Sequence, residues 1–296
     1  MLATPCRGKK VRKGQSALLT VSNSPPVISL ADYDKRKRQI TDELRKAATT
    51  IGFFYISDHG VAQELIDRAF AANEEYCAQP EEAKDKLPVV RWDTRQLTGI
   101  ERNYLPDGTL RESSIAKFDV HEDMQKAWPD KKYCPNYRQT TVEFMNALPP
   151  VANKILGCLA LGLGLPENFF TETANPYRAD NFTFLQYHKY PGLEGRTWKE
   201  GVNCVTAHTD ESLITLLFAK SPGLELASGR DGKAATGDTY GCYQVDSWTP
   251  CPPIPGCFTV NIGDPLQYWS DGVLLSNYHR VRCPKPDEYQ GDRYSI

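Results

Sequence analysis

The stretch that decides the fold reads Thr206-Ala207-His208-Thr209-Asp210-Glu211-Ser212-Leu213-Ile214-Thr215-Leu216-Leu217. A second stretch, later in the chain, reads Ser276-Asn277-Tyr278-His279-Arg280-Val281. Both stretches predict β-strands. His208 and Asp210 stand two positions apart, so an extended strand points both side chains to one face. His279, from the second strand, completes two imidazoles and one carboxylate. This is the ligand set of non-haem iron sites that keep coordination positions open for O2 chemistry.

A motif this short can also arise by chance, so each ligand has a structural alternative. His208 could be a hydrogen-bonded histidine beside an acidic turn, and His279 could be a core histidine next to Arg280. The metal interpretation is favoured because both histidines lie on predicted strands of one β-rich block. The remaining histidines are expected outside the metal site: His59, His121 and His188.

The pattern of apolar residues changes near residue 181. Before it, two short strands (27–30 and 53–56) and helical spacing over 40–51, 65–70 and 142–163 are predicted, with a break at Pro149-Pro150. Residues 91–104 predict irregular backbone, followed by a turn at 106–108. After residue 181, Gly and Pro turns separate short predicted strands at 182–187, 204–210, 213–218, 224–226, 243–245, 258–262 and 293–296. Many short strands in one block predict a sandwich or barrel, here preceded by helices.

The chain divides into three expected regions. Residues 1–24 carry basic residues and no acidic residue, which predicts a disordered tail or, alternatively, a transit peptide. Residues 25–180 form a helical and mixed region, and residues 181–296 form the catalytic core. These two regions are expected to pack as one structural unit, with a surface loop at 229–241.

The composition bears on partners and compartment. A net charge of −2 gives no attraction to nucleic acid or to a membrane surface, and no apolar run reaches the roughly 18 residues of a membrane span. Nine cysteines without a C-x-x-C pair predict reduced thiols. We therefore expect a cytoplasmic monomer that acts on a small molecule, with organellar targeting by residues 1–24 as the alternative.

A second polar pair follows the metal ligands. Arg293 and Ser295 also share one strand face, and a guanidinium binds a carboxylate bidentately; the alternative is a surface arginine on an edge strand. Substrate contacts are expected from the 91–118 region and from the strand that begins near residue 182. The candidates are Arg95, Arg102, Lys117, Phe184 and Gln186. For the three basic residues, solvated surface cations are the favoured alternative.

Several separated motifs, in this order, resemble the iron(II)/2-oxoglutarate-dependent dioxygenases of the isopenicillin N synthase-like group. The resemblance covers residues 25–296. In the N-terminal region it rests on the motifs at 26–30, 52–56 and 58–61. In the core it rests on His208-Thr209-Asp210, on 253–256 and 260–264, on His279-Arg280-Val281 and on Arg293-x-Ser295.

The resemblance implies a mixed α/β, mainly β fold: a double-stranded β-helix of the jelly-roll or cupin type with helices packed outside. It implies that Fe(II) is bound by His208, Asp210 and His279. It also implies that Arg293, Ser295 and Tyr190 bind the far carboxylate of 2-oxoglutarate, with O2 as the other co-substrate. The implied activity is oxidation of an unactivated C–H bond of a small-molecule, specialised metabolite by hydroxylation, desaturation or oxidative cyclisation. Succinate and CO2 are then the co-products.

Two departures from the family pattern leave alternative functions open. His188 stands where relatives commonly have asparagine, two positions before the tyrosine. The run Ser212-Leu213-Ile214-Thr215 looks like isopenicillin N synthase itself, which makes a 2-oxoglutarate-independent oxidase or oxidative cyclase the alternative enzyme. A non-catalytic ligand-binding member of the fold is a further alternative. A structural zinc protein is disfavoured because closely spaced thiolates are absent.

Overall fold

The computed structural model describes residues 24–94, 96–104, 110–178, 180–192, 203–227, 247–285 and 287–296. The helices are α1 (Tyr33–Thr50), α2 (Gln63–Cys77), α3 (Glu81–Lys84), α4 (Tyr137–Ala147), α5 (Pro149–Gly162) and α6 (Asp264–Trp269), with a 3-10 turn at Glu122–Lys126. The strands are β1 (Val27–Ser29), β2 (Phe53–Ser57), β3 (Gly99–Tyr104), β4 (Leu110–Lys117), β5 (Phe184–Tyr190), β6 (Asn203–His208), β7 (Ile214–Leu217), β8 (Leu224–Ala227), β9 (Trp248–Pro250), β10 (Phe258–Ile262), β11 (His279–Arg282) and β12 (Arg293–Ser295).

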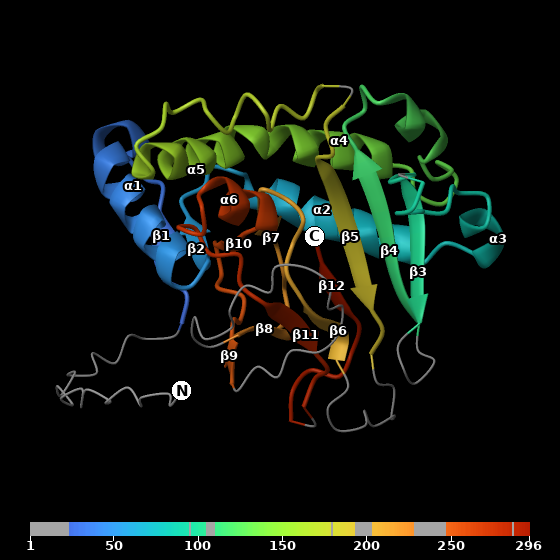
Figure 1. Ribbon diagram of the computed structural model, residues 1–296. Coiled ribbons are helices and arrows are strands. Elements are labelled where there is room, and N and C mark those ends of the chain that lie inside the picture. Colours follow the sequence, from blue (N-terminus) through green and yellow to red (C-terminus); the bar gives the residue numbers. More distant parts are fainter. Residues whose placement is uncertain are drawn as a thin grey trace, which may run out of the picture.

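The strands form two layers. Backbone hydrogen bonds of 2.8 and 2.9 Å between Phe218 and Ile296 connect the chain just after β7 with the chain just after β12. The sheets β1-β2-β10-β7 and β12-β5-β4-β3 therefore continue into one curved layer. The sheet β6-β11-β8-β9 forms the second layer, on the side away from α4 and α5 (Figure 1). The predicted double-stranded β-helix with helices outside is confirmed.

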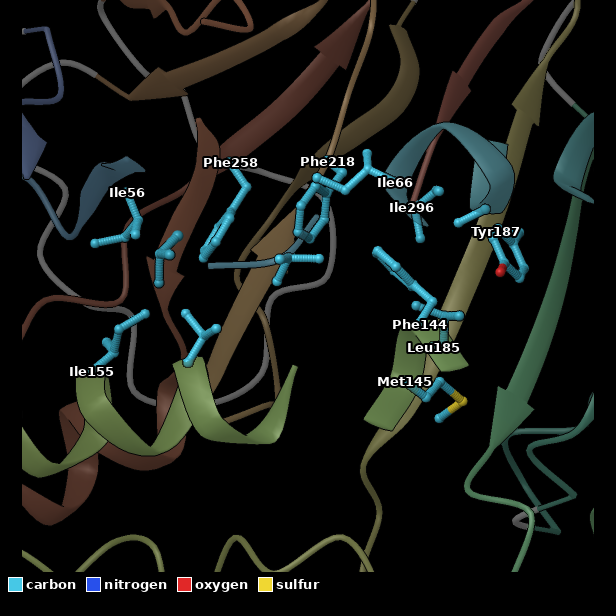
Figure 2. Packing of buried hydrophobic residues seen from close by; sticks show 14 of the residues in the cluster. Ile56, Ile66, Phe144, Met145, Ile155, Leu185, Tyr187, Phe218, Phe258 and Ile296 are labelled. Atoms are coloured by element: carbon cyan, nitrogen blue, oxygen red, sulfur yellow. The ribbon is translucent and has the colours of Figure 1, made fainter. Parts of the chain in front are cut away.

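Alternation along β10 separates the hydrophobic core from the space between the layers. Three of its residues are fully buried in the cluster shared with the helices: Phe258, Val260 and Ile262. Thr259 and Asn261 point to the opposite face. Figure 2 shows the helix residue Phe144 close to Phe218, with ring centroids 5.3 Å apart. Because burying such a side chain stabilises by roughly 1.5–3 kcal/mol, this cluster fixes the curved layer against the helices.

The helical stretch after residue 136 breaks where the sequence predicted. α4 ends at Ala147 and α5 begins at Pro149, because proline cannot donate an interior hydrogen bond but fits the first turn of a helix. By length and composition, Tyr137–Gly162 could cross a membrane, and half of that window is buried within the protein. α4 packs on α2 and α5 packs on α1, which is the arrangement of core helices.

The structure corrects the prediction of irregular backbone at 91–104, because residues 99–104 form a strand. β3 and β4 form an antiparallel hairpin with Glu101 opposite Ser113. Apolar alternation does not reveal these strands, because both faces of β4 carry polar groups: Arg111 and Ser113 on one, Glu112 and Ser114 on the other. The predicted turn at 106–108, the loop at 229–241 and the strand at 243–245 lie outside the described residues.

Candidate active site

The chain brings His208, Asp210 and His279 together at one end of the second layer. His208 ends β6 and His279 begins β11, and the two are paired across the antiparallel strands. The Nε2 atoms of His208 and His279 lie 3.6 and 3.5 Å from Oδ1 of Asp210. Ligand atoms that share one metal at about 2.1 Å and at right angles are about 3 Å apart. The three groups therefore have the spacing of one metal site.

Asp210 lies beyond the strand that was predicted to contain it. β6 ends at His208, because the carbonyl of Asp210 accepts a hydrogen bond of 2.8 Å from the backbone N–H of Asp264 instead of pairing in the sheet. The carboxylate still faces the same space as the two imidazoles, as the two-residue spacing predicted.

Backbone carbonyls orient both imidazoles. Nδ1 of His208 lies 2.8 Å from the carbonyl oxygen of Thr206, and Nδ1 of His279 lies 3.3 Å from that of Asn277. In each ring Nδ1–H donates, so Nε2 keeps its lone pair for a metal. Burial, followed by the neighbouring His208, lowers the pKa of His279 to about 4. His279 is therefore neutral at pH 7, as a metal ligand must be.

Two neighbouring side chains hold the Asp210 carboxylate. Its Oδ2 accepts hydrogen bonds from Oγ1 of Thr215 and, at 2.8 Å, from Nδ2 of Asn261. Oδ1 is left facing the imidazoles. Burial alone would raise the pKa of Asp210, but attraction to His279 and these two hydrogen bonds outweigh it, so the pKa lies below its ordinary value. The carboxylate is thus ionised and aimed at the metal position.

Gly263 allows the loop that carries Asp210 to close over β10. Its N–H donates to the carbonyl of Leu213 at 3.0 Å, and a Cβ at Gly263 would lie 1.7 Å from the carbonyl oxygen of Ser212. Gly263→Ala is therefore expected to displace the loop and weaken Fe(II) binding about 10- to 100-fold, the range for lost supporting contacts. Iron content and Fe(II) titration measure this. Gly162→Ala, whose Cβ meets only the side chain of Arg45, is the control, and equal iron affinity in the two variants would contradict the expectation.

Arg293 presents an unsatisfied donor between the layers. It lies opposite Tyr190 in the β12–β5 register, with its guanidinium 4.9 Å from the centre of the tyrosine ring. Its Nε donates to the carbonyl of Pro222 at 2.9 Å, while its buried Nη1 has no hydrogen-bond partner. Ser295, also buried, faces His188 across the strands. A buried guanidinium with an open donor fits a carboxylate ligand.

His188 lies beside this pocket. Its Nδ1 is 2.8 Å from Oγ of Ser113. Burial, followed by the charges of Arg111 and Arg293, lowers the pKa of His188 to about 3. The histidine is therefore neutral in the folded protein at any pH near 7.

Acid should destabilise the metal-free protein through this histidine. Its pKa in the unfolded chain is near 6.5, so between about pH 6.5 and pH 3 the unfolded state binds more protons and the free energy of unfolding falls as pH falls. His188→Gln removes that proton uptake and is expected to flatten the pH dependence by up to about 1.4 kcal/mol per pH unit. Urea unfolding at about pH 7.5, 6 and 5 measures the slopes. His279 contributes equally to both proteins, so identical slopes would contradict the assignment.

The structure separates the predicted substrate residues. Phe184 and Gln186 share the β5 face of His188 and Tyr190, and Nε2 of Gln186 donates to Glu101 at 3.1 Å. Arg102 lies on the opposite face of the hairpin, ion-paired to Asp85 and Glu81 at 2.9 and 2.8 Å, so it does not reach the site. Lys117 is bound to Asp123 at 2.9 Å. Arg95 lies outside the described residues.

Arg111 was not among the predicted residues. Alternation along β4 places it on the same face as Ser113 once the hairpin is recognised.

Two family models match the chain. One, described as the N-terminal part of the non-haem dioxygenase in morphine synthesis, matches residues 25–146; the other, the 2OG-Fe(II) oxygenase superfamily, matches residues 179–296. A curated 2-oxoglutarate-dependent dioxygenase from Didymella fabae is 29% identical over 280 residues, which is 88% of this chain and 78% of that protein.

Solved structures share the fold. The full-length Neurospora crassa protein in complex with alpha-KG (2-oxoglutarate) superimposes with a TM-score of 0.77 at 21% identity, over 92% of this chain and 83% of that one. JOX2 in complex with 2OG, Fe and JA gives a TM-score of 0.69 at 24% identity, over 92% and 73% of the two chains. At these identities the likeness shows the architecture.

Proposed function

The chain belongs to the 2OG-Fe(II) oxygenase superfamily, and from that premise we propose that it oxidises an unactivated C–H bond of a small-molecule, specialised metabolite. It is an Fe(II)- and 2-oxoglutarate-dependent dioxygenase. The proposed reaction consumes substrate, 2-oxoglutarate and O2 and releases oxidised product, succinate and CO2. The product is an alcohol, an alkene or a ring. The matched family description, which names a dioxygenase of morphine synthesis, supports a specialised metabolite.

Two observations carry the proposal: three metal-binding groups have ligand atoms within 4.8 Å of one another, and the buried guanidinium of Arg293 has an unsatisfied donor. We propose that His208, Asp210 and His279 hold the iron. We propose that Arg293, Ser295 and Tyr190 hold the far carboxylate of 2-oxoglutarate. Bound together, iron(II), 2-oxoglutarate and O2 supply the oxidant for the C–H bond.

The residues of the chain would orient these groups and keep the site dry. The carbonyls of Thr206 and Asn277 fix the two imidazoles, and Thr215 and Asn261 fix the carboxylate. The ring of Phe53 packs edge-on against His279 with centroids 5.4 Å apart, which shields one side of the metal position from water. Such supporting contacts set ligand geometry and solvent access.

The structure gives the Ser212-Leu213-Ile214-Thr215 run a role that does not require ring closure. Oγ of Ser212 and Oγ1 of Thr215 lie 2.9 Å apart, and Thr215 holds Asp210. The run therefore supports a metal ligand under either chemistry. The open donor of Arg293 fits a carboxylate under either chemistry, and similarity to 2-oxoglutarate-dependent dioxygenases favours the 2-oxoglutarate-dependent enzyme.

A screen of small metabolites for substrate-dependent succinate tests the proposal. The true substrate should raise succinate formation above the background of enzyme, Fe(II) and 2-oxoglutarate. A product mass gain of about 16 units would mark hydroxylation, and a loss of about 2 units would mark desaturation or ring closure. Substrate oxidation without succinate would overturn the proposed co-product.

We further propose a cytoplasmic monomer without nucleic-acid or membrane partners. The net charge of −2 supports this, since it offers little attraction to polyanions. The nine cysteines form no C-x-x-C pair, which supports a reducing compartment.

A further inference from the structure

One strip of the curved layer faces the site. Ser113 of β4, His188 of β5 and Ser295 of β12 are paired in a row across the three strands. Arg111 lies two residues before Ser113 on the same strand, so it shares this face. The intervening residue, Glu112, points the other way and binds Lys84 at 3.0 Å. Arg111 therefore faces the site, two strands from Arg293, or about 10 Å at the spacing of neighbouring strands.

Arg111 is a mostly buried cation whose carboxylate partner is distant. Its side chain is 16% exposed, and its nearest carboxylate oxygen, on Glu101, lies 4.0 Å from Nη2. Its buried Nε has no hydrogen-bond partner. Arg102, on the opposite face, also leaves its buried Nε without a hydrogen-bond partner, but its Nη1 and Nη2 make ion pairs of 2.9 and 2.8 Å. A mostly buried guanidinium with an unpaired Nε is costly unless a ligand supplies an acceptor.

Glu101 is occupied elsewhere. Its Oε1 accepts a hydrogen bond from Nε1 of Trp92 at 2.8 Å, and its Oε2 accepts one from Gln186 at 3.1 Å. These bonds hold the carboxylate at the edge of the strip, out of hydrogen-bond range of Arg111. Trp92 in turn packs edge-on against Phe184, with centroids 5.9 Å apart. Trp92 and Phe184 thus form an aromatic surface next to Glu101, with Phe184 opposite Lys117 in the β4–β5 register.

We propose that Arg111 binds a carboxylate of the primary substrate, whose apolar body extends along this face toward Trp92. The assignment rests on the proposed function and deepens it: the substrate class is a small carboxylic acid. Arg293 serves the co-substrate from two strands away, so the cavity contains two separate anion-binding positions. Arg111 also acts electrostatically on His188, which places the cation within range of the site.

Binding of acids and matched amides to the Fe(II)- and 2-oxoglutarate-loaded protein, without O2, tests this. The probes are phenylacetate, cinnamate, hexanoate and indole-3-carboxylate, each paired with its primary amide. The wild type is expected to bind the best acid about 10- to 100-fold tighter than its amide. Arg111→Gln should abolish that preference, Arg111→Lys should keep part of it, and Glu101→Gln should strengthen acid binding. Arg102→Gln, on the opposite face, is the matched control and should keep the preference.

Three results would overturn the proposal: no acid preference in the wild type, an acid preference that survives in Arg111→Gln, or a raised KM for 2-oxoglutarate in Arg111→Gln as the main effect. The last would assign Arg111 to the co-substrate. Succinate formation by the wild type is measured in parallel. Its absence would count against the proposed function, whereas the acid-to-amide ratio reports on Arg111 alone.

Discussion

Asp210→Ala is expected to lose iron binding and 2-oxoglutarate turnover together. The carboxylate is the one anionic group of the three, and its Oδ1 lies 3.6 and 3.5 Å from the two imidazole nitrogens. Without it, two neutral imidazoles remain and Thr215 and Asn261 lose their acceptor. Since losing a supporting contact costs about 10- to 100-fold in metal affinity, losing the ligand should cost at least about 100-fold, with succinate formation at background.

Anaerobic Fe(II) titration and succinate measurement on the same preparation test this. Glu211→Ala is the matched control, because Glu211 is the neighbouring carboxylate and is exposed. It should retain iron and turnover. Circular dichroism shows whether each variant keeps its fold. Full succinate formation by Asp210→Ala would remove Asp210 from the metal site.

Arg293→Gln is expected to raise the KM for 2-oxoglutarate about 10- to 100-fold, while kcat at saturating 2-oxoglutarate falls much less. The open Nη1 of Arg293 is the donor that fits the far carboxylate, and a hydrogen bond to a charged group contributes about 1.5–3 kcal/mol. This carboxylate does not react, so losing its hydrogen bond from Arg293 weakens binding in the ground state and in the transition state alike. The effect therefore appears in KM.

Steady-state kinetics at several 2-oxoglutarate concentrations measure the split between KM and kcat. Arg293→Lys keeps the charge but not the planar fork and should fall between wild type and Arg293→Gln. Arg138→Gln is the control, since Arg138 lies on α4 and is ion-paired to Asp119. An unchanged KM in Arg293→Gln would show that another group holds the co-substrate.

The metal site was predictable because its signal is local. Two ligands two positions apart on a strand share a face, and the third lies on another predicted strand of the same β-rich block. The position of Asp210 beyond β6 was not predictable. It depends on the hydrogen bond from Asp264, a residue 54 positions away by number (264 − 210), and no local pattern contains that contact.

The substrate face was predicted less well for a physical reason. The β3–β4 hairpin is polar on both sides, so apolar alternation could not reveal its strands, and Arg102 and Arg111 looked equivalent in the sequence. Pairing decides between them: Arg102 is ion-paired to Asp85 and Glu81 of the α3 region, while the carboxylate of Glu101 lies 4.0 Å from Arg111. Which arginine faces the site is a consequence of register, and register is set by the whole sheet.

Simultaneous measurement of O2 uptake and succinate formation, with the natural substrate or the best acid from the screen, tests the central claim most directly. The account predicts one succinate for each O2 consumed, with no O2 uptake above background when 2-oxoglutarate or Fe(II) is omitted. Substrate-dependent O2 uptake that continues without 2-oxoglutarate would contradict it and assign the site to an oxidase that draws all its electrons from the substrate.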